Sequence, residues 1–342
     1  MRRSTSKNLS IKDVAKLAGV SISTVSRVLN KHPGVKKNHL AAVQDAIKQL
    51  NYKPSVLAQR LATGKSNVIA LVIPRYEGIF YSFYALELIS GIGTMAAALK
   101  LDLLLHISDD WTSLNLNGLG GVIFADIIKN RKQVEEALAG GIPTIVINNL
   151  VEDISVNCIA IDNIGGAENA VNYLIDLGHR SIAHISGELF TQAAAHRFEG
   201  YKRALKKHGI QINEDYVVTT DYSRGQARSA AEKLFKLPKP PTAIFVASDS
   251  MALEVMAVAR ERGIKIPADV SLVGFDDNPS GLYGPVALTT VRQPLVKMAQ
   301  DSVKELSVIM NLSKKSPTRR IILPTELIIR ESCQALSPEK EK

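Results

Sequence analysis

The sequence has few cysteines, few aromatic residues and no long apolar run. Cys158 and Cys333 are the only thiols in 342 residues, which argues against a disulfide framework and excludes a zinc site of clustered cysteines. The longest apolar runs, residues 68–74 and 101–105, are far shorter than the ~18 residues that a membrane span requires. The first twenty residues carry charges throughout and show no signal peptide. We therefore expect a cytoplasmic protein without a membrane partner.

Positive charge is concentrated at one end of the chain. The net charge is +9, but the first 65 residues alone hold 13 Lys and Arg against Asp13 and Asp45, whereas the remainder is near neutral. Nucleic-acid phosphates are the commonest partners of such a basic segment, because neutralising them releases counterions. A solvated basic tail would lack hydrophobic periodicity, and this segment is clearly periodic.

The periodicity of this basic segment predicts three short helices. Ser10 and Asp13 form the pattern of a capping box with Asp in place of Glu, and the helix that follows ends at Gly19. A second helix begins after Ser21, and two short helices joined by a tight glycine-containing turn form a helix-turn-helix. A third helix is expected from about residue 37 to 50. Its inner face is expected to comprise Leu40, Val43, Ala46, Ile47 and Leu50.

The second helix carries the residues that are suited to reading DNA. Four of its side chains alternate with buried positions and are expected to be exposed: Ile22, Ser23, Ser26 and Arg27. Arg27 can make a bidentate contact with guanine, Ser23 can contact several bases, and Ile22 can meet a thymine methyl group. A short fourth helix, at 55–62, has too few residues to be stable in isolation.

Four collinear motifs in this segment, at 11–21, 24–30, 52–54 and 58–61, resemble the LacI/GalR repressor family. The resemblance implies that the second helix reads the major groove and that the fourth is a hinge which folds on operator DNA beside its dimer mate. It also implies that Leu61 is wedged into the central base step, where new contacts offset the cost of unstacking. The expected DNA-binding residues are Ile22, Ser23, Ser26, Arg27, Asn30, Tyr52, Ala58 and Leu61.

Beyond residue 65 the pattern changes to alternating strands and helices. Strands are expected at 68–73, 101–106, 122–124, 144–147, 182–185, 243–246 and 270–275. Helices are expected at 166–177, 195–208, 224–235 and 250–262. Continuous apolar strands alternating with helices predict parallel sheets covered on both faces, here as two doubly wound lobes. Ligands of such sheets bind beyond the carboxyl ends of the strands, where two lobes can form a cleft.

The family resemblance extends to about residue 331. Its markers lie at 161–163, 177–180, 197–201, 247–252, 267–276 and 288–294. It implies a periplasmic-binding-protein-like core that dimerises and holds an effector between its lobes, with the chain crossing between them near 149–159, 275–283 and 291. The expected layout is a helix-turn-helix domain at 1–53, a hinge helix and connector at 54–65, and an effector-binding and dimerisation domain at 66–342.

The resemblance assigns six residues to the effector: Asn148, Arg197, Tyr222, Ser248, Asp276 and Gln293. A guanidinium and a carboxylate facing one cleft can bind the hydroxyls of a sugar, and Tyr222 can pack against its ring. The alternative for Arg197 and Asp276 is a cross-lobe ion pair without a ligand. The alternative for Tyr222 is ordinary packing.

Two segments depart from the family pattern. The loop at 75–84 is about four residues longer than expected and carries Tyr76, Phe80, Tyr81, Phe83 and Tyr84, which suit either sugar stacking or a dimer interface. The segment at 107–120 is barely long enough for a parallel crossover. Either this lobe lacks a helix, or Trp111 and Leu114 cover the sheet instead. The tail after residue 331 has no leucine heptad to support a tetramer.

Three classes of function were compared. An enzyme is not favoured, because the sequence has no phosphate-binding glycine loop, metal-spaced histidine pair or nucleophile elbow. A transport binding protein would carry a signal peptide and no DNA-binding segment. We expect a sequence-specific transcriptional regulator, most simply a repressor, that needs no cofactor or metal. It would bind palindromic double-stranded operator DNA as a homodimer under the control of a small effector, most simply a sugar. The residues do not distinguish a repressor from an activator, or an effector that acts as inducer from one that acts as corepressor.

Overall fold

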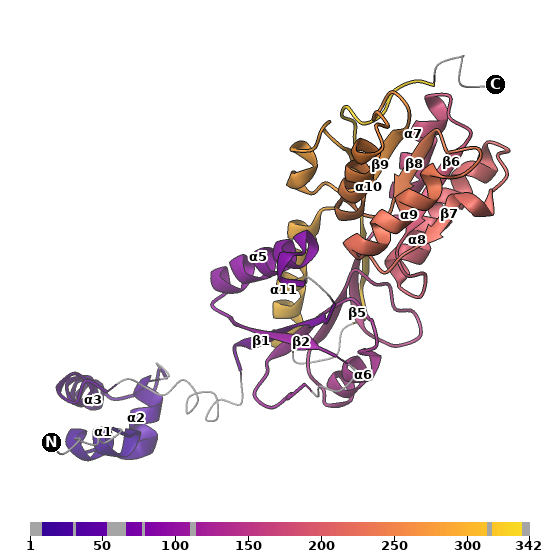
Figure 1. Cartoon of the computed structure of the whole chain (residues 1–342). Helices are drawn as coiled ribbons and strands as arrows, with labels where there is room; N and C mark the ends of the chain where they lie inside the picture. The colour runs from indigo at the N-terminus through magenta and orange to yellow at the C-terminus, as the bar shows by residue number, and fades with distance from the viewer. Residues whose placement is uncertain are drawn as a thin grey trace. The chain divides into compact units, whose positions relative to one another are not determined.

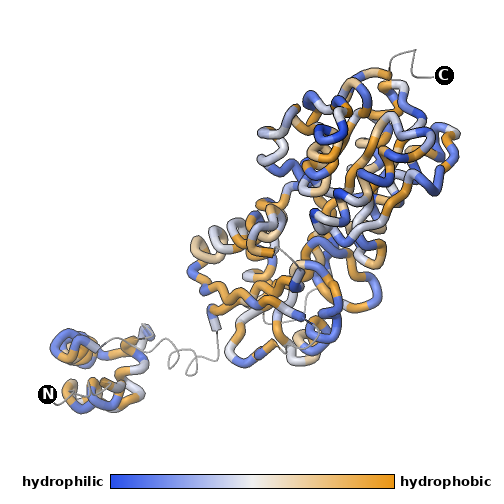
Figure 2. Tube along the Cα trace, viewed as in Figure 1, coloured by the Kyte–Doolittle hydropathy of each residue, from blue (hydrophilic) through white to orange (hydrophobic). Residues whose placement is uncertain are grey.

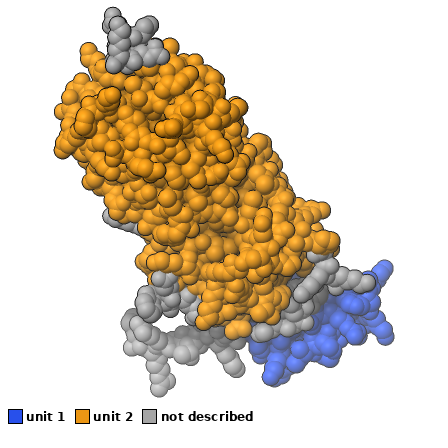
Figure 3. Space-filling model, turned by 90° about the vertical axis from the view of Figure 1, so that its right-hand side faces the viewer, with its two compact units in different colours: residues 1–66 blue, residues 67–342 orange. Residues whose placement is uncertain are grey.

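A computed structural model describes residues 9–29, 32–52, 66–76, 79–109, 114–312 and 317–336. The chain divides into two compact units, residues 1–66 and 67–342, coloured separately in Figure 3. We refer to the first unit as the head and to the second as the body.

The head contains the three expected helices α1 (Ile11–Ala18), α2 (Ile22–Leu29) and α3 (Lys37–Gln49). The Asp13 carboxylate accepts hydrogen bonds from the backbone N–H and the hydroxyl of Ser10, both at 2.8 Å, so the predicted cap is present. Gly19 ends α1 with a φ of 63°, which glycine adopts without strain. The prediction for Leu40 was wrong: its side chain is 37% exposed, because the inner face of α3 is centred on Val43 and Ala46.

The body contains two six-stranded sheets, which define its two lobes. The first sheet has the order β11-β5-β4-β3-β1-β2, and the second has the order β12-β10-β9-β8-β6-β7. All strand pairs are parallel except β10 with β12. The first-lobe strands are β1 (Val68–Pro74), β2 (Asp102–Ser108), β3 (Gly121–Ala125), β4 (Thr144–Ile147), β5 (Asn157–Ile161) and β11 (Arg320–Leu323). The second-lobe strands are β6 (Ile182–Ser186), β7 (Val217–Thr219), β8 (Ala243–Val246), β9 (Ser271–Asp276), β10 (Thr289–Arg292) and β12 (Glu326–Ile328).

Helices cover both faces of each sheet (Figure 1). In the first lobe, α5 (Phe83–Ala98) and α11 (Leu295–Asn311) pack together on one face, and α6 (Arg131–Ala139) lies on the other. In the second lobe, α7 (Asn163–Asp176) and α8 (Gln192–Lys207) cover one face, and α9 (Arg224–Phe235) and α10 (Asp249–Glu261) cover the other. Short 3-10 turns occur at η1 (Ile79–Tyr81), η2 (Glu214–Tyr216) and η3 (Pro279–Leu282). The strands between these layers are mostly apolar (Figure 2), so the predicted fold of two doubly wound lobes is confirmed.

The chain passes between the two sheets after Ile161, after Arg292 and again after Leu323. The expected crossing near 149–159 stops two residues short of the passage after Ile161, because β5 still belongs to the first sheet. The expected crossing near 275–283 was wrong, because β9 and β10 pair with each other and the chain between them stays in the second lobe. The passage after Arg292 lies beside the one expected near 291, and the passage after Leu323 was not foreseen.

One of the two unusual segments differs from its sequence-based description, and the described part of the other agrees with it. Helix α5 begins at Phe83, and the hydroxyl of Ser82 accepts a hydrogen bond from the Ala85 N–H, so Phe83 and Tyr84 belong to a helix and the loop is shorter than expected. Between β2 and β3, the described residues 114–120 form no helix. Leu114 instead packs against apolar side chains of β1 and β3. Trp111 lies outside the described residues, so its expected role in covering the sheet stays a prediction.

Among the described residues, no helix is both long and apolar enough to cross a membrane.

Candidate functional site

The carboxyl ends of the parallel strands carry most of the expected effector residues. Asn148 follows β4 of the first lobe, whereas Ser248 follows β8 and Gln293 follows β10 of the second. Asp276 is the last residue of β9, and Arg197 extends from α8. Because parallel strands end at the same edge of a sheet, residues far apart in sequence reach one region.

Arg197 is held inside the second lobe by several contacts. Its side chain is 4% exposed, its Nε donates to Oδ1 of Asn163 at 2.8 Å, and its Nη1 donates to the carbonyl of Ala247 at 2.5 Å. Its Cζ lies 3.8 Å from the ring centroid of Phe275, and its Nη1 lies 3.8 Å from Oδ1 of Asp276. The ion pair therefore exists, but α8 and β9 belong to one lobe, so it is not the cross-lobe pair offered as an alternative.

Asp126 is a site residue that sequence reasoning missed. It directly follows β3, and its carboxylate accepts hydrogen bonds from the Tyr84 hydroxyl and from Nδ2 of Asn148, both at 2.7 Å. Burial raises the pKa of Asp126, against the lowering effects of Tyr84, Asn148 and the charge of Arg197. A carboxyl placed immediately after an apolar strand was the available signal.

Tyr222 lies between the charges of the two lobes. Burial raises the pKa of its hydroxyl; the positive charge of Arg197 lowers it, and the negative charges of Asp276 and Asp126 raise it further. Asp126 belongs to the first lobe and the other two to the second. The lobes are also joined by Gln192 of α8, whose amide accepts from the Leu150 N–H at 2.7 Å and donates to its carbonyl at 2.9 Å. Side chains of both lobes therefore meet in this region.

Four residues of this cleft have left-handed backbone conformations. The φ angles are 68° for Asp126, 66° for Asn148, 66° for Tyr222 and 131° for Asp276. Such conformations are uncommon outside glycine and concentrate at functional sites, where the surrounding structure holds them in place. Asn51, Lys100, Lys129 and Asp277 also have positive φ angles, so the backbone conformation supports the side-chain contacts without singling out these four residues.

The ring of Tyr222 occupies the space that a side chain at Gly187 would fill. A Cβ on Gly187 would lie 1.9 Å from Cε2 of Tyr222, which requires the ring to move. Gly187 is therefore a positioning residue for Tyr222.

We expect Gly187→Ala to displace the Tyr222 ring and to cost about 1–3 kcal/mol of unfolding free energy through overpacking. Urea unfolding measures this cost, and removing the ring with Tyr222→Ala in the same chain should recover most of it. Gly225→Ala on α9 is the matched control, because a Cβ there meets nothing within 4 Å. A Gly187→Ala variant as stable as this control would contradict the assignment.

Ser248 is a helix cap as well as a cleft residue. It is the N-cap of α10, where its side chain accepts a hydrogen bond from the Met251 N–H at 3.4 Å, and it is 7% exposed. Its hydroxyl proton remains able to serve as a donor.

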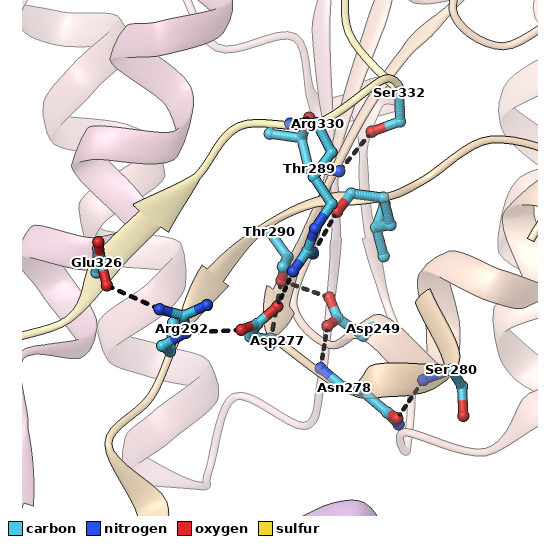
Figure 4. Close-up of polar contacts among 11 residues, drawn as sticks. Asp249, Asp277, Asn278, Ser280, Thr289, Thr290, Arg292, Glu326, Arg330 and Ser332 are labelled. Atoms are coloured by element: carbon cyan, nitrogen blue, oxygen red, sulfur yellow. Dashed lines mark hydrogen bonds and ion pairs between the residues drawn. The ribbon is translucent and has the colours of Figure 1, made fainter. Parts of the chain in front are cut away.

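A network of carboxylates and arginines supports the loop after β9 (Figure 4). Asp277 receives hydrogen bonds from Nη2 of Arg330 at 2.5 Å and Nε of Arg292 at 2.7 Å, which lower its pKa against a burial effect that raises it. Asp249 accepts from the Thr290 hydroxyl at 2.6 Å and from the Asn278 N–H at 2.7 Å. The two adjacent carboxylates therefore have different partners. Asp276 lies beside Arg197, whereas Asp277 pairs with Arg292 and Arg330.

The loop before α5 has aromatic side chains in two different environments. Tyr76 is 38% exposed, and its partial burial raises the pKa of its hydroxyl to about 12, with the charges of Asp126 and Asp276 acting in the same direction. Phe80 and Tyr81 are 64% and 91% exposed, as expected of an interface with another molecule. Each interpretation of this loop thus fits some of its residues.

In the head, α2 presents the expected side chains. Ile22 is 45% exposed, Ser23 and Arg27 are exposed, and Ser26 is half-buried. Tyr52 packs in the small core of the head with only 9% exposed, so its ring stabilises the helices, and its expected DNA contact stays a prediction. Asn30, Ala58 and Leu61 lie outside the described residues.

Two family models match the chain. The model of bacterial regulatory proteins of the lacI family covers residues 10–55, and the periplasmic binding protein-like domain covers 171–333. Catabolite control protein A of Priestia megaterium is 34% identical over 335 residues, which span 95% of this chain and 99% of the relative.

Solved structures agree with the sequence comparison. The Lac repressor dimer bound to operator and the anti-inducer ONPF has a TM-score of 0.81 at 25% identity, covering 96% of this chain and 100% of that chain. The complex of the regulator CelR with cellobiose has a TM-score of 0.71 at 28% identity, covering 95% and 99%. A helix-turn-helix head and a periplasmic-binding-protein-like body define a DNA-binding transcriptional regulator with an effector-binding domain, a class that is not enzymatic. The chain belongs to the LacI family of bacterial regulatory proteins.

Proposed function

We propose that this regulator represses transcription in the cytoplasm, binds a palindromic operator as a homodimer, and is controlled by a sugar in the cleft between its lobes. The meeting of Arg197, Asp276, Asn148 and Tyr222 at the strand ends carries the effector assignment. Dimeric operator binding by the Lac repressor and cellobiose binding by CelR support the same interpretation. The proposal includes the expected domain layout, with a DNA-binding domain at 1–53, a hinge helix and connector at 54–65, and an effector-binding domain at 66–342.

Sugar binding follows from the chemistry of the assigned side chains. A planar guanidinium can donate to hydroxyl oxygens, carboxylate and amide oxygens can accept from hydroxyl protons, and a tyrosine ring can pack against a pyranose face. The ligand can change operator affinity only if it binds one conformation of the body more tightly than another, and the size of that difference limits the change.

We expect Arg27→Ala to weaken operator binding by about 1–3 kcal/mol and to relax base preference at one position of each half-site, because a bidentate guanine contact is lost. Operator selection from random DNA followed by gel-shift titration measures both effects. Lys48→Ala on α3 is the control, since an exposed lysine contributes charge without reading bases. An unaltered base preference in Arg27→Ala would show that α2 does not read DNA through this residue.

A further inference from the structure

Two buried amide oxygens at the strand ends lack a hydrogen-bond partner, and so does the hydroxyl of Ser186 at the end of β6, which can donate or accept. Within the described residues, Oδ1 of Asn148 and Oε1 of Gln293 are buried and receive no hydrogen bond, and each residue is 6% exposed. Asn148 comes from the first lobe and Gln293 from the second-lobe strand β10. An unpaired buried acceptor is costly unless a water or a ligand supplies a donor, so each oxygen is a contact point for a ligand hydroxyl.

Each of these amides is oriented by a carboxylate. Nδ2 of Asn148 donates to Oδ1 of Asp126 at 2.7 Å, and Nε2 of Gln293 donates to Oδ1 of Asp276 at 2.5 Å. Because an ionised carboxylate only accepts hydrogen bonds, the amide nitrogen must face it and the amide oxygen must face away. Each lobe therefore contributes an amide–carboxylate pair whose free atoms are acceptors.

Both pairs lie within reach of the charge of one guanidinium. Nη1 of Arg197 lies 3.8 Å from Oδ1 of Asp276. Burial raises the pKa of Asp126 and the charge of Arg197 lowers it, and Tyr222 is affected by all three groups.

Some donors of the cleft are already engaged, while the hydroxyls of Ser186 and Ser248 and the two amide oxygens are open. Nε and Nη1 of Arg197 donate to Asn163 and Ala247, and the Tyr84 hydroxyl donates to Asp126. An anionic ligand would bring further acceptors to a cleft that holds two carboxylates. A neutral polyol would bring the missing O–H donors.

We propose that Asp126 is a ligand-binding residue, and that its pair with Asn148 and the pair of Asp276 with Gln293 make the cleft selective for uncharged, hydroxyl-rich ligands over their anionic counterparts. The ligand donates hydroxyl protons to the first pair on one side and to the second pair on the other. The inference rests on the proposed function, because it assumes that the effector occupies this cleft.

The test uses matched sugars that differ in one charged group: glucose with glucuronate and glucose 6-phosphate, and galactose with galacturonate. Cellobiose is included as a neutral disaccharide. Each sugar is titrated into the full chain by isothermal calorimetry. In any set of matched sugars that binds, the neutral sugar should bind at least about 10-fold more tightly than its charged counterparts, a difference of about 1.4 kcal/mol.

Asp126→Asn keeps the size of the side chain and removes its charge. We expect this substitution to weaken the affinity for the neutral sugar at least about 10-fold, because one carboxylate acceptor is lost. The preference for the neutral sugar over its anionic counterpart should become smaller, because the variant repels the anion less. Tyr84→Phe leaves the carboxylate in place and removes one of its donors, so the preference for the neutral sugar should persist with a weaker affinity. Asp301→Asn on α11, a carboxylate paired with Lys297 and Lys304, should bind like the unmodified chain. Circular dichroism confirms that each variant is folded.

The possible failures are distinguishable. Tighter binding of the uronates or the phosphate by the unmodified chain, or an Asp126→Asn variant that binds as the unmodified chain does, overturns this inference while an effector-controlled regulator stands. If none of the sugars binds, the proposed sugar effector fails and the inference fails with it.

Discussion

Arg197→Ala is expected to abolish the response of operator binding to the ligand. The substitution removes a buried cation that donates to Asn163 and Ala247 and lies beside Asp276, so the cleft loses its charged donor. Charge-assisted hydrogen bonds contribute about 1.5–3 kcal/mol each, which predicts a loss of ligand affinity of at least about 10-fold. The ligand-induced change in operator affinity, typically about 5- to 150-fold in such systems, should disappear.

Operator affinity without ligand should change little in this variant, because Arg197 belongs to the body and the DNA-reading side chains of α2 belong to the head. Isothermal titration of the ligand and anisotropy titration of the operator measure the two affinities. Arg203→Ala is the matched control: it lies on the same helix, pairs with Glu199 at an exposed position, and should cost less than about 1 kcal/mol. Undiminished ligand binding by Arg197→Ala would refute the assignment of the site.

Asp249 is expected to make the stability of the body depend on pH. Its side chain is fully buried, and burial followed by the nearby charge of Asp276 raises its pKa. The folded chain therefore holds a proton that the unfolded chain releases at its lower pKa. The stability contributed by that proton is present below the unfolded pKa and is lost as pH rises towards the folded pKa, with a slope of up to about 1.4 kcal/mol per pH unit.

Asp249→Asn should remove this dependence while keeping the local geometry. Its amide can accept from the Asn278 N–H and donate to the Thr290 hydroxyl, in place of a protonated carboxyl. Urea unfolding at pH 5, 6 and 7 should show the variant gaining stability relative to the unmodified chain as pH rises, while the exposed substitution Asp102→Asn gives a parallel curve. A constant difference between the chain and Asp249→Asn would contradict the raised pKa.

Local pattern predicted the helix-turn-helix and most apolar strands, because each depends on a run of neighbouring residues. The same reasoning missed the short strands β5, β7, β10, β11 and β12, which contain polar or β-branched residues among apolar ones. The family resemblance misplaced the crossing near 275–283. Which lobe a strand joins is decided by pairing partners far along the chain, and no local spacing encodes that choice.

The candidate site was predicted in part. Family motifs located Arg197, Asp276 and Gln293, which do meet in the structure. Asp126 was missed because its significance depends on Tyr84 and Asn148, residues 42 and 22 positions away in sequence. Tyr52 shows that a residue of a DNA-binding motif can also pack in the core of that motif.

The central claim is that the ligand in the cleft and the operator on the head are energetically coupled. The direct measurement is operator affinity with and without a saturating sugar, together with affinity for that sugar with and without operator. The account predicts that the two ratios are equal and lie between about 5 and 150, because coupling between two sites is reciprocal. An operator affinity that stays the same at saturating sugar would contradict it.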